Sequence, residues 1–215
     1  MKERNVTVTL NKAKEWFNSG NATLKEIALQ AFDKDELTYN FKNITTFKKA
    51  CEALDLDYDD MFYITKNIAT ISKASAAMFK LNIIRKALNL GQDLHLTKDP
   101  KDSYIYYPYN PFVTKGSTYY KSEISSGKME VIGKVKSEGE EYNVLGGRAG
   151  HGGSAGLGFF GSNAGVGDAY ATVGFLGCAN KEIAQHLGKY FGMLITEAKY
   201  GDMVDFEVIE EKYKI

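Results

Sequence analysis

The first chemistry that the residue spacing suggests is nucleotide binding. GLGFFG, residues 156–161, has the G-x-G-x-x-G pattern of a turn that cradles a pyrophosphate. Such a turn follows an apolar strand and opens a helix, whose N-terminus then meets the phosphates. The preceding residues, RAGHGGSA, are not an apolar strand, and the following residues, SNAGVGDAYATVG, contain glycines that disfavour a helix. We therefore expect no nucleotide and no other cofactor. The glycines are interpreted as turn and close-packing residues.

Cys178 and His186 are the nucleophile and base that could form a catalytic pair. His186 falls off the apolar stripe of its expected helix, and no G-x-S-x-G turn is present. We therefore predict no catalytic residues. Cys51 and Cys178 belong to no C-x-x-C pair, so two separate buried thiols are expected.

Metal ligation is not supported by the spacing of the candidate ligands. His95, His151 and His186 lie far apart in the chain and have no H-x-x-x-H or C-x-x-C partner. The acidic segment DLDYDD, residues 55–60, lacks the glycine and the distal glutamate of a calcium loop. We interpret it as a solvated charged turn and predict no metal site.

Aromatic side chains offer a more plausible binding surface. Six of the 14 tyrosines lie between residues 104 and 120. Tyrosine combines a large rigid face with a polar tip, which suits interfaces and sugar-stacking surfaces. The alternative is that these tyrosines pack between the two halves of the molecule, and both can hold. The candidate ligand- or partner-binding residues, including two from the glycine-rich loop, are Tyr106, Tyr107, Tyr109, Tyr119, Tyr120, Arg148, His151 and Tyr170.

The elements that would position these residues divide the chain into three parts. Residues 1–95 contain two glycines and no proline and read as a small helical domain. TLKE at 23–26 predicts a capping box, and Ala77, Leu81, Ile84 and Leu88 form an apolar stripe at helical spacing. Residues 96–112 carry all three prolines and predict a linker or an extended crossing strand.

Residues 113–215 predict a β-rich domain with a packed C-terminal helix. KMEVIGKVKSEGEEYNVLGG alternates apolar and polar positions around a Glu-Gly turn, which favours a hairpin. Asn180 is the expected N-cap of one long helix that stops at Gly201, and the last residues predict an edge strand. The expected class is α+β: a helical N-terminal domain, then a Gly/Tyr-rich antiparallel β unit with a packed C-terminal helix.

Charge and hydropathy bound the possible partners. Lys plus Arg (27) equals Asp plus Glu (27), so we expect no nucleic-acid partner. No apolar run reaches the roughly 18 residues of a membrane span, and we expect no membrane insertion. The first ten residues lack the apolar region of a secretory signal, which predicts synthesis in the cytoplasm without export by that route.

Four segments resemble a group of poorly characterised proteins encoded by phages and prophages of gut Bacteroidetes, crAss-like phages among them. They are ITTFKKACEALDL, AMFKLNIIRKALNLGQD, YIYYPY and VGFLGCANKEIAQHLGKYFGMLI, in the same order, over roughly residues 44–200. Many members of that group carry Gly-Ser-Arg-Leu-Cys before the helix. This chain reads GFLGC at 174–178, so no role of that arginine is carried over. The resemblance implies a phage-associated origin and no catalytic residues.

A looser resemblance concerns the glycine-rich segment. LGGRAGHGGSAGLGFFGSNAGVGDAYATVGFLGC is similar to the C-terminal core of the C-type-lectin-like domains of diversified phage receptor-binding proteins. Those domains usually end near this point, whereas this chain continues into a helix.

These observations lead to a ranked expectation of function. First is a non-enzymatic virion component, capsid- or tail-associated, such as a decoration, head-fibre or adaptor protein. It would contact other virion proteins or its own copies as a homo-oligomer. Second is a carbohydrate- or host-receptor-binding module, with a host-surface glycan as ligand. Third is an enzyme of unknown class, which would need Cys178, His186 and a carboxylate within hydrogen-bond reach.

Overall fold

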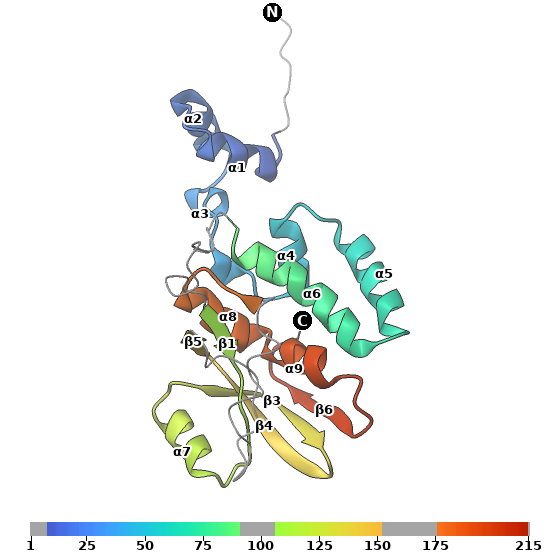
Figure 1. Ribbon diagram of the computed structural model, residues 1–215. Helices are drawn as coiled ribbons and strands as arrows, with labels where there is room; N and C mark the ends of the chain where they lie inside the picture. The colour runs from blue at the N-terminus through green and yellow to red at the C-terminus, as the bar shows by residue number, and fades with distance from the viewer. Residues whose placement is uncertain (1–7, 91–105, 152–175, 215) are drawn as a thin grey trace, which may run out of the picture. The chain divides into compact units, whose positions relative to one another are not determined.

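The computed structural model describes residues 8–90, 106–151 and 176–214. The chain splits into two compact units, Met1–Asn40 and Phe41–Ile215. Helices come first along the chain, antiparallel strands follow, and two packed helices lie near the C-terminus (Figure 1). The α+β class and the order of its parts are confirmed.

The first unit contains α1 (Leu10–Asn18), α2 (Ala22–Ala31) and α3 (Lys34–Leu37). Its core consists of Ala13, Ala28 and Leu37. The predicted capping box is wrong, because Asn21 caps α2 and its side chain accepts hydrogen bonds from the backbone N–H groups of Thr23 and Leu24. The helix therefore begins one residue before Thr23.

Three helices open the second unit after a 3₁₀ turn, η1 (Phe41–Asn43). They are α4 (Phe47–Ala53), α5 (Tyr58–Ala69) and α6 (Lys73–Leu88). The predicted stripe of α6 is confirmed, since Ala77, Leu81, Ile84 and Leu88 are all buried. The segment 55–60 begins a helix rather than forming only a turn, because Asp57 caps α5 by accepting from the Asp60 N–H at 3.0 Å.

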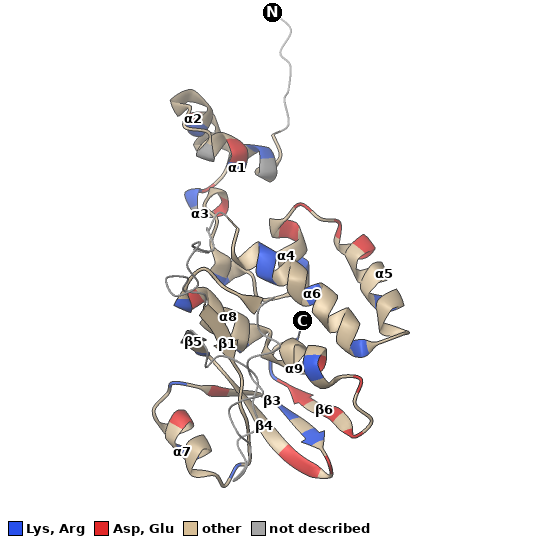
Figure 2. Cartoon of the chain, viewed as in Figure 1, with Lys and Arg blue, Asp and Glu red and all other residues tan. Residues whose placement is uncertain are grey.

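The main sheet has the strand order β2 (Phe112–Val113), β4 (Glu140–Gly146), β3 (Glu130–Ser137), β6 (Phe206–Glu211), all antiparallel. Glu138 and Gly139 join β3 to β4 with positive φ angles of 51° and 83°, as a type I′ turn requires. The hairpin and the edge position of β6 were both predicted. Lys134 of β3 pairs with Glu210 of β6, and Figure 2 shows basic β3 beside acidic β6.

A second, two-stranded sheet joins β1 (Tyr106–Tyr109) to β5 (Arg148–His151). Between β2 and β3 lies a helix, α7 (Thr118–Ser125), within the region that the sequence predicted to be β-rich. Ser117 explains the difference, because its side chain caps the helix by accepting from the Tyr120 N–H at 3.1 Å.

The C-terminal helix is split into α8 (Lys181–Tyr190) and α9 (Gly192–Tyr200). Asn180 caps α8 and Gly201 ends α9, both as predicted. The prediction of a single long helix was wrong, because Phe191 leaves helical geometry, with φ −120° and ψ 11°. This break sets Gly192 directly against the Ile132 and Asn110 side chains.

Helices α8 and α9 lie between the sheets and the α4–α6 layer (Figure 1). α6 packs along α9, and Asp202 accepts a hydrogen bond from the Ala74 N–H at 3.2 Å. The first three helices of the second unit therefore belong with the sheet. The boundary between the two units along the chain falls between Asn40 and Phe41, whereas the change in composition predicted a boundary near residue 95. Composition follows local structure, but packing across the chain decides the units.

Candidate functional site

Three of the predicted binding residues meet in one cluster. Tyr109 comes from β1, Tyr119 from α7 and Arg148 from β5. Side-chain hydrogen bonds join the Tyr109 and Tyr119 hydroxyls, and Arg148 also donates to Tyr119. Burial raises the pKa of both tyrosines, so both hydroxyls stay protonated at neutral pH.

Glu123 of α7 completes this cluster and was missed from the sequence. Its Oε1 accepts from Arg148 Nη1 at 3.1 Å, while its residue is only 7% exposed. Its Oε2 is buried and has no hydrogen-bond partner among the described residues. Glu123 follows Tyr119 by four residues, so a helix places both on one face. The sequence predicted β structure here, and the contact between residues four positions apart is a property of a helix.

The cluster therefore presents a half-exposed guanidinium, held by a buried carboxylate and flanked by tyrosine. Arginine has five N–H donors in a fixed fork, and Glu123 and Tyr119 engage only part of them. The remaining donors suit the hydroxyl, carbonyl or acid oxygens of a ligand.

The other predicted residues do not join this cluster. Tyr106 bonds through its backbone to Cys178 at 3.1 and 2.8 Å. Strand alternation places Tyr107 on the same face of β1 as Tyr109, but no side-chain contact among the described residues links Tyr107 to the cluster. Tyr120 packs against the core of Val113, Met129 and Leu145. The backbone of His151, in β5, pairs with the backbone of Tyr106, in β1. The His151 side chain, Tyr170 and the G-x-G-x-x-G segment lie outside the described residues.

Cys178 and His186 direct their polar atoms to different partners. The Cys178 thiol donates to the Leu176 carbonyl oxygen at 3.4 Å, and His186 Nε2–H donates to the Ile44 carbonyl oxygen at 2.7 Å. Burial raises the pKa of Cys178 to about 12, which keeps the thiol protonated and poorly nucleophilic at neutral pH. Cys51 and Cys178 are separate buried thiols, as predicted.

His186 is buried, contrary to the prediction that it lies off the apolar face of its helix. The segment around η1 covers that side of α8, and the Phe41 ring meets the His186 ring edge-on at 5.6 Å. Helical periodicity marks the side that faces the sheet, but it does not show that a second segment covers the neighbouring side.

Acidification is expected to destabilise the fold through His186. Burial lowers the pKa of His186 below its usual value near 6.5, so below about pH 6.5 the unfolded chain binds a proton that the folded chain resists. The resulting loss is up to about 1.4 kcal/mol per pH unit as the pH falls below the unfolded value. Urea titrations of wild type and His186→Asn at pH 7.5 and 5.5 should show a smaller loss in the variant. Equal losses would contradict this assignment.

Glu130 of β3 forms a second charged contact that the sequence did not indicate. Lys189 of α8 reaches its Oε1 at 3.0 Å, and Lys212 and Tyr213, which follow β6, also donate to it. Burial by itself would raise the pKa of Glu130, but these hydrogen bonds lower it to about 2. The contact connects the sheet to α8, and the Glu130 carboxylate oxygens already accept hydrogen bonds from side chains of the same chain.

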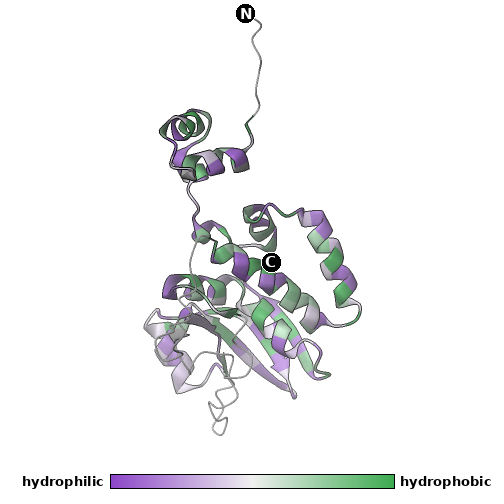
Figure 3. Ribbon diagram, turned by 45° about the horizontal axis from the view of Figure 1, so that its top comes forward, coloured by the Kyte–Doolittle hydropathy of each residue, from purple (hydrophilic) through white to green (hydrophobic). Residues whose placement is uncertain are grey.

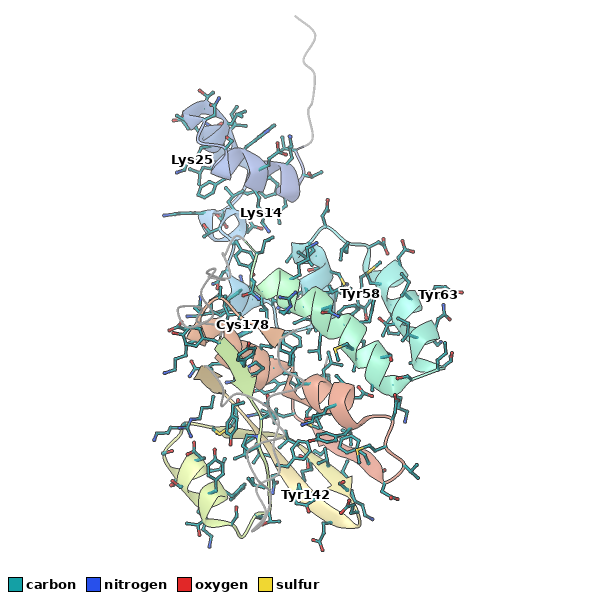
Figure 4. All side chains as sticks on the ribbon, in the orientation of Figure 1. Lys14, Lys25, Tyr58, Tyr63, Tyr142 and Cys178 are labelled. Carbon is teal, nitrogen blue, oxygen red and sulfur yellow. The ribbon has the colours of Figure 1, made fainter. Side chains whose placement is uncertain are left out.

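The exposed side of α5 is the other feature with functional potential. Tyr58, Met61, Thr65 and Ile68 occupy the less exposed side. On the opposite side Tyr63 is 67% exposed, and at the boundary between the two sides Phe62 is 47% exposed while its ring stacks on the Tyr58 ring at 5.8 Å. We call Asp59, Phe62, Tyr63, Ile64 and Lys66 the outer face of α5. Figure 4 shows Tyr58 on the side toward α6 and Tyr63 on the opposite side, and Figure 3 shows hydrophobic positions along the helix.

Comparisons with protein-family models, with characterised proteins and with solved structures find no match. In the part of the chain that the structure describes, no three His, Cys, Asp or Glu side chains gather as metal ligands. Within the same residues, no helix is long and apolar enough to cross a membrane. Among the described residues, the outer face of α5 and the Arg148 cluster are the two features with functional potential.

Proposed function

We propose that this chain is a structural or accessory component of a phage particle, capsid- or tail-associated, that acts through protein–protein contacts. The observation that carries the contact function is the outer face of α5. The phage assignment rests on the resemblance of residues 44–200 to proteins of Bacteroidetes phages. Its partners are other virion proteins or further copies of itself.

The outer face of α5 suits a contact surface for a physical reason. The exposed side of a helix on a globular protein is normally polar, and the side toward the core is apolar. Here Phe62, Tyr63 and Ile64 are consecutive and exposed while Thr65 is buried. Contiguous exposed apolar side chains mark interaction sites more often than scattered ones do. Covering them would gain about 25 cal/mol for each Å² of apolar surface removed from water.

Mass spectrometry of gradient-purified particles from a phage that encodes the chain tests the proposal. The chain should copurify at constant stoichiometry with the major capsid protein. Particles assembled with Tyr63→Glu should contain less of it, because a charge then enters the contact. Val204→Glu is the matched control, since Val204 is 98% exposed on the loop before β6. Absence of the wild-type chain from particles would refute a virion role.

The Arg148 cluster supports a second candidate function, binding of a carbohydrate or host receptor. Sugar-binding sites combine aromatic faces with charged side chains that hydrogen-bond to hydroxyl groups. The half-exposed guanidinium of Arg148, anchored by Glu123 beside Tyr119, offers both features.

A glycan array with the purified chain tests this second function. Arg148→Gln should abolish any glycan signal, and Tyr119→Phe should weaken it while keeping the ring in the core. Lys136→Gln is the control, because Lys136 is exposed on the distant part of the sheet. Unchanged glycan signal in Arg148→Gln, or no signal from the wild type, would remove this candidate.

A further inference from the structure

The outer face of α5 is complementary to a second copy of itself. We propose that two copies of this chain associate through α5, with the two helices antiparallel about a two-fold axis that passes close to Tyr63. The inference rests on the proposed contact function of this face and names its partner.

The spacing of the charges carries the argument. Asp59 and Lys66 are seven residues apart, which is two helical turns, so they project from the same edge of the helix. Their midpoint lies between Phe62 and Tyr63. In an antiparallel pair centred there, Asp59 of one copy lies opposite Lys66 of the other, and the contact occurs twice. A two-fold interface requires this reciprocity, in which residue i meets j and j meets i.

Charge order along the helix also selects the antiparallel arrangement. In a parallel pair Asp59 would face Asp59, and Lys66 would face Lys66. Asp59 and Lys66 make no ion pair within the described residues, so both are free to pair across copies. Figure 2 shows acidic residues at the start of α5.

The fold uses the outer face at its edge, where the Phe62 ring stacks on the Tyr58 ring at 5.8 Å. α5 is held against its own chain by Tyr58, Met61, Thr65 and Ile68, and the Tyr58 ring lies 6.1 Å from the Phe47 ring of α4. Tyr63, at the centre of the outer face, is directed away from this packing (Figure 4). An aromatic residue near the centre of a small interface is the type of residue that contributes most to binding.

The expected association is weak in solution. One helix face per copy is smaller than the interface of a stable dimer, so a dissociation constant on the order of 0.1 mM is expected. Multiple copies on a particle would strengthen such contacts through their high effective concentration.

Sedimentation velocity of the full chain over a concentration series tests the proposal by charge exchange. Wild type should show a dimer fraction that rises with concentration. Asp59→Lys and Lys66→Asp should each weaken dimerisation about tenfold, because two like-charge contacts replace two ion pairs. The double variant Asp59→Lys/Lys66→Asp should return to within about twofold of wild type. Only a partner carrying the same face is restored by exchanging both charges in one chain.

Two further variants keep the result interpretable. Tyr63→Glu should leave the chain monomeric, whereas Val204→Glu should dimerise like wild type. Thermal unfolding of every variant checks that α5 still folds. A double variant no better than the single ones would overturn the proposal. So would a wild type that stays monomeric, the result expected if residues 1–40 of the same copy or a different protein cover α5.

The outcomes separate this inference from the proposed function. A chain that dimerises as expected but is absent from particles would refute the virion role and leave the self-association standing. A monomeric chain present in particles would refute the self-association alone.

Discussion

Asn110→Asp is expected to lower the free energy of unfolding by about 3 kcal/mol or more. Asn110 is 1% exposed, and its Nδ2 donates to the carbonyl oxygens of Leu145 at 2.9 Å and Gly188 at 2.7 Å. These two bonds join the end of β4 to α8. A carboxylate has nearly the same shape but donates nothing, so two buried carbonyls would face a buried negative charge.

Urea denaturation at pH 7 measures this loss. Asn82→Asp is the matched control, because Asn82 is exposed on α6 and should change stability by less than about 0.5 kcal/mol. The penalty of Asn110→Asp should shrink at lower pH, because the protonated acid regains one donor and loses its charge. A change in Asn110→Asp no larger than that of the control would show that the bridge does not hold this junction.

Gly146→Ala is expected to cost about 3 kcal/mol, because the added methyl group has no space. A Cβ at Gly146, the last residue of β4, would lie 2.6 Å from the Gly188 carbonyl oxygen and 2.8 Å from Ile132 Cγ2. The oxygen belongs to the backbone of α8 and cannot rotate away. Strand and helix would have to separate, which would also stretch the two bonds of Asn110.

Gly116→Ala is the control for this substitution. Nothing lies within 4 Å of a Cβ at Gly116, so alanine there should be neutral or slightly stabilising. Thermal unfolding of the two variants should differ by several degrees or more. Equal unfolding temperatures would mean that the close approach of β4 and α8 is not required.

Both predictions concern the same contact, the approach of one backbone to another. Gly146 lets β4 approach the Gly188 carbonyl oxygen of α8, and Asn110 satisfies the carbonyl groups that this approach buries. In the sequence, Asn110 lies between two prolines, and such a segment is typical of a turn. Nothing local distinguishes a turn residue from one that bridges segments 35 and 78 positions away.

Features with local causes were predictable. The stripe of α6 repeats at helical spacing, and a helix with one apolar side buries that side wherever it packs. Asn180 caps α8 because its side chain reaches the N–H of Ile183 three residues on, at 2.9 Å. The Glu138–Gly139 turn follows from the tolerance of glycine for positive φ between two alternating segments.

The errors also have physical reasons. Helix α7 was not predicted within the β-rich region because its tyrosines and Ile124 suit both structures, and the Ser117 cap is the local feature that favours the helix. Residues 181–200 carry one apolar stripe, yet packing of Gly192 against Ile132 and Asn110 accompanies a break at Phe191. In each case a contact or cap outweighed a weak intrinsic preference.

By itself the sequence determined the α+β class, the main helices and the central hairpin, because hydrophobic period, caps and turn residues act within a few positions. Only the tertiary structure decided which side chains meet. It joined Tyr109, Tyr119 and Arg148 to Glu123, turned His186 inward, and left Tyr63 exposed on α5. These outcomes depend on which segments cover one another, and such contacts between distant parts of the chain leave no local pattern.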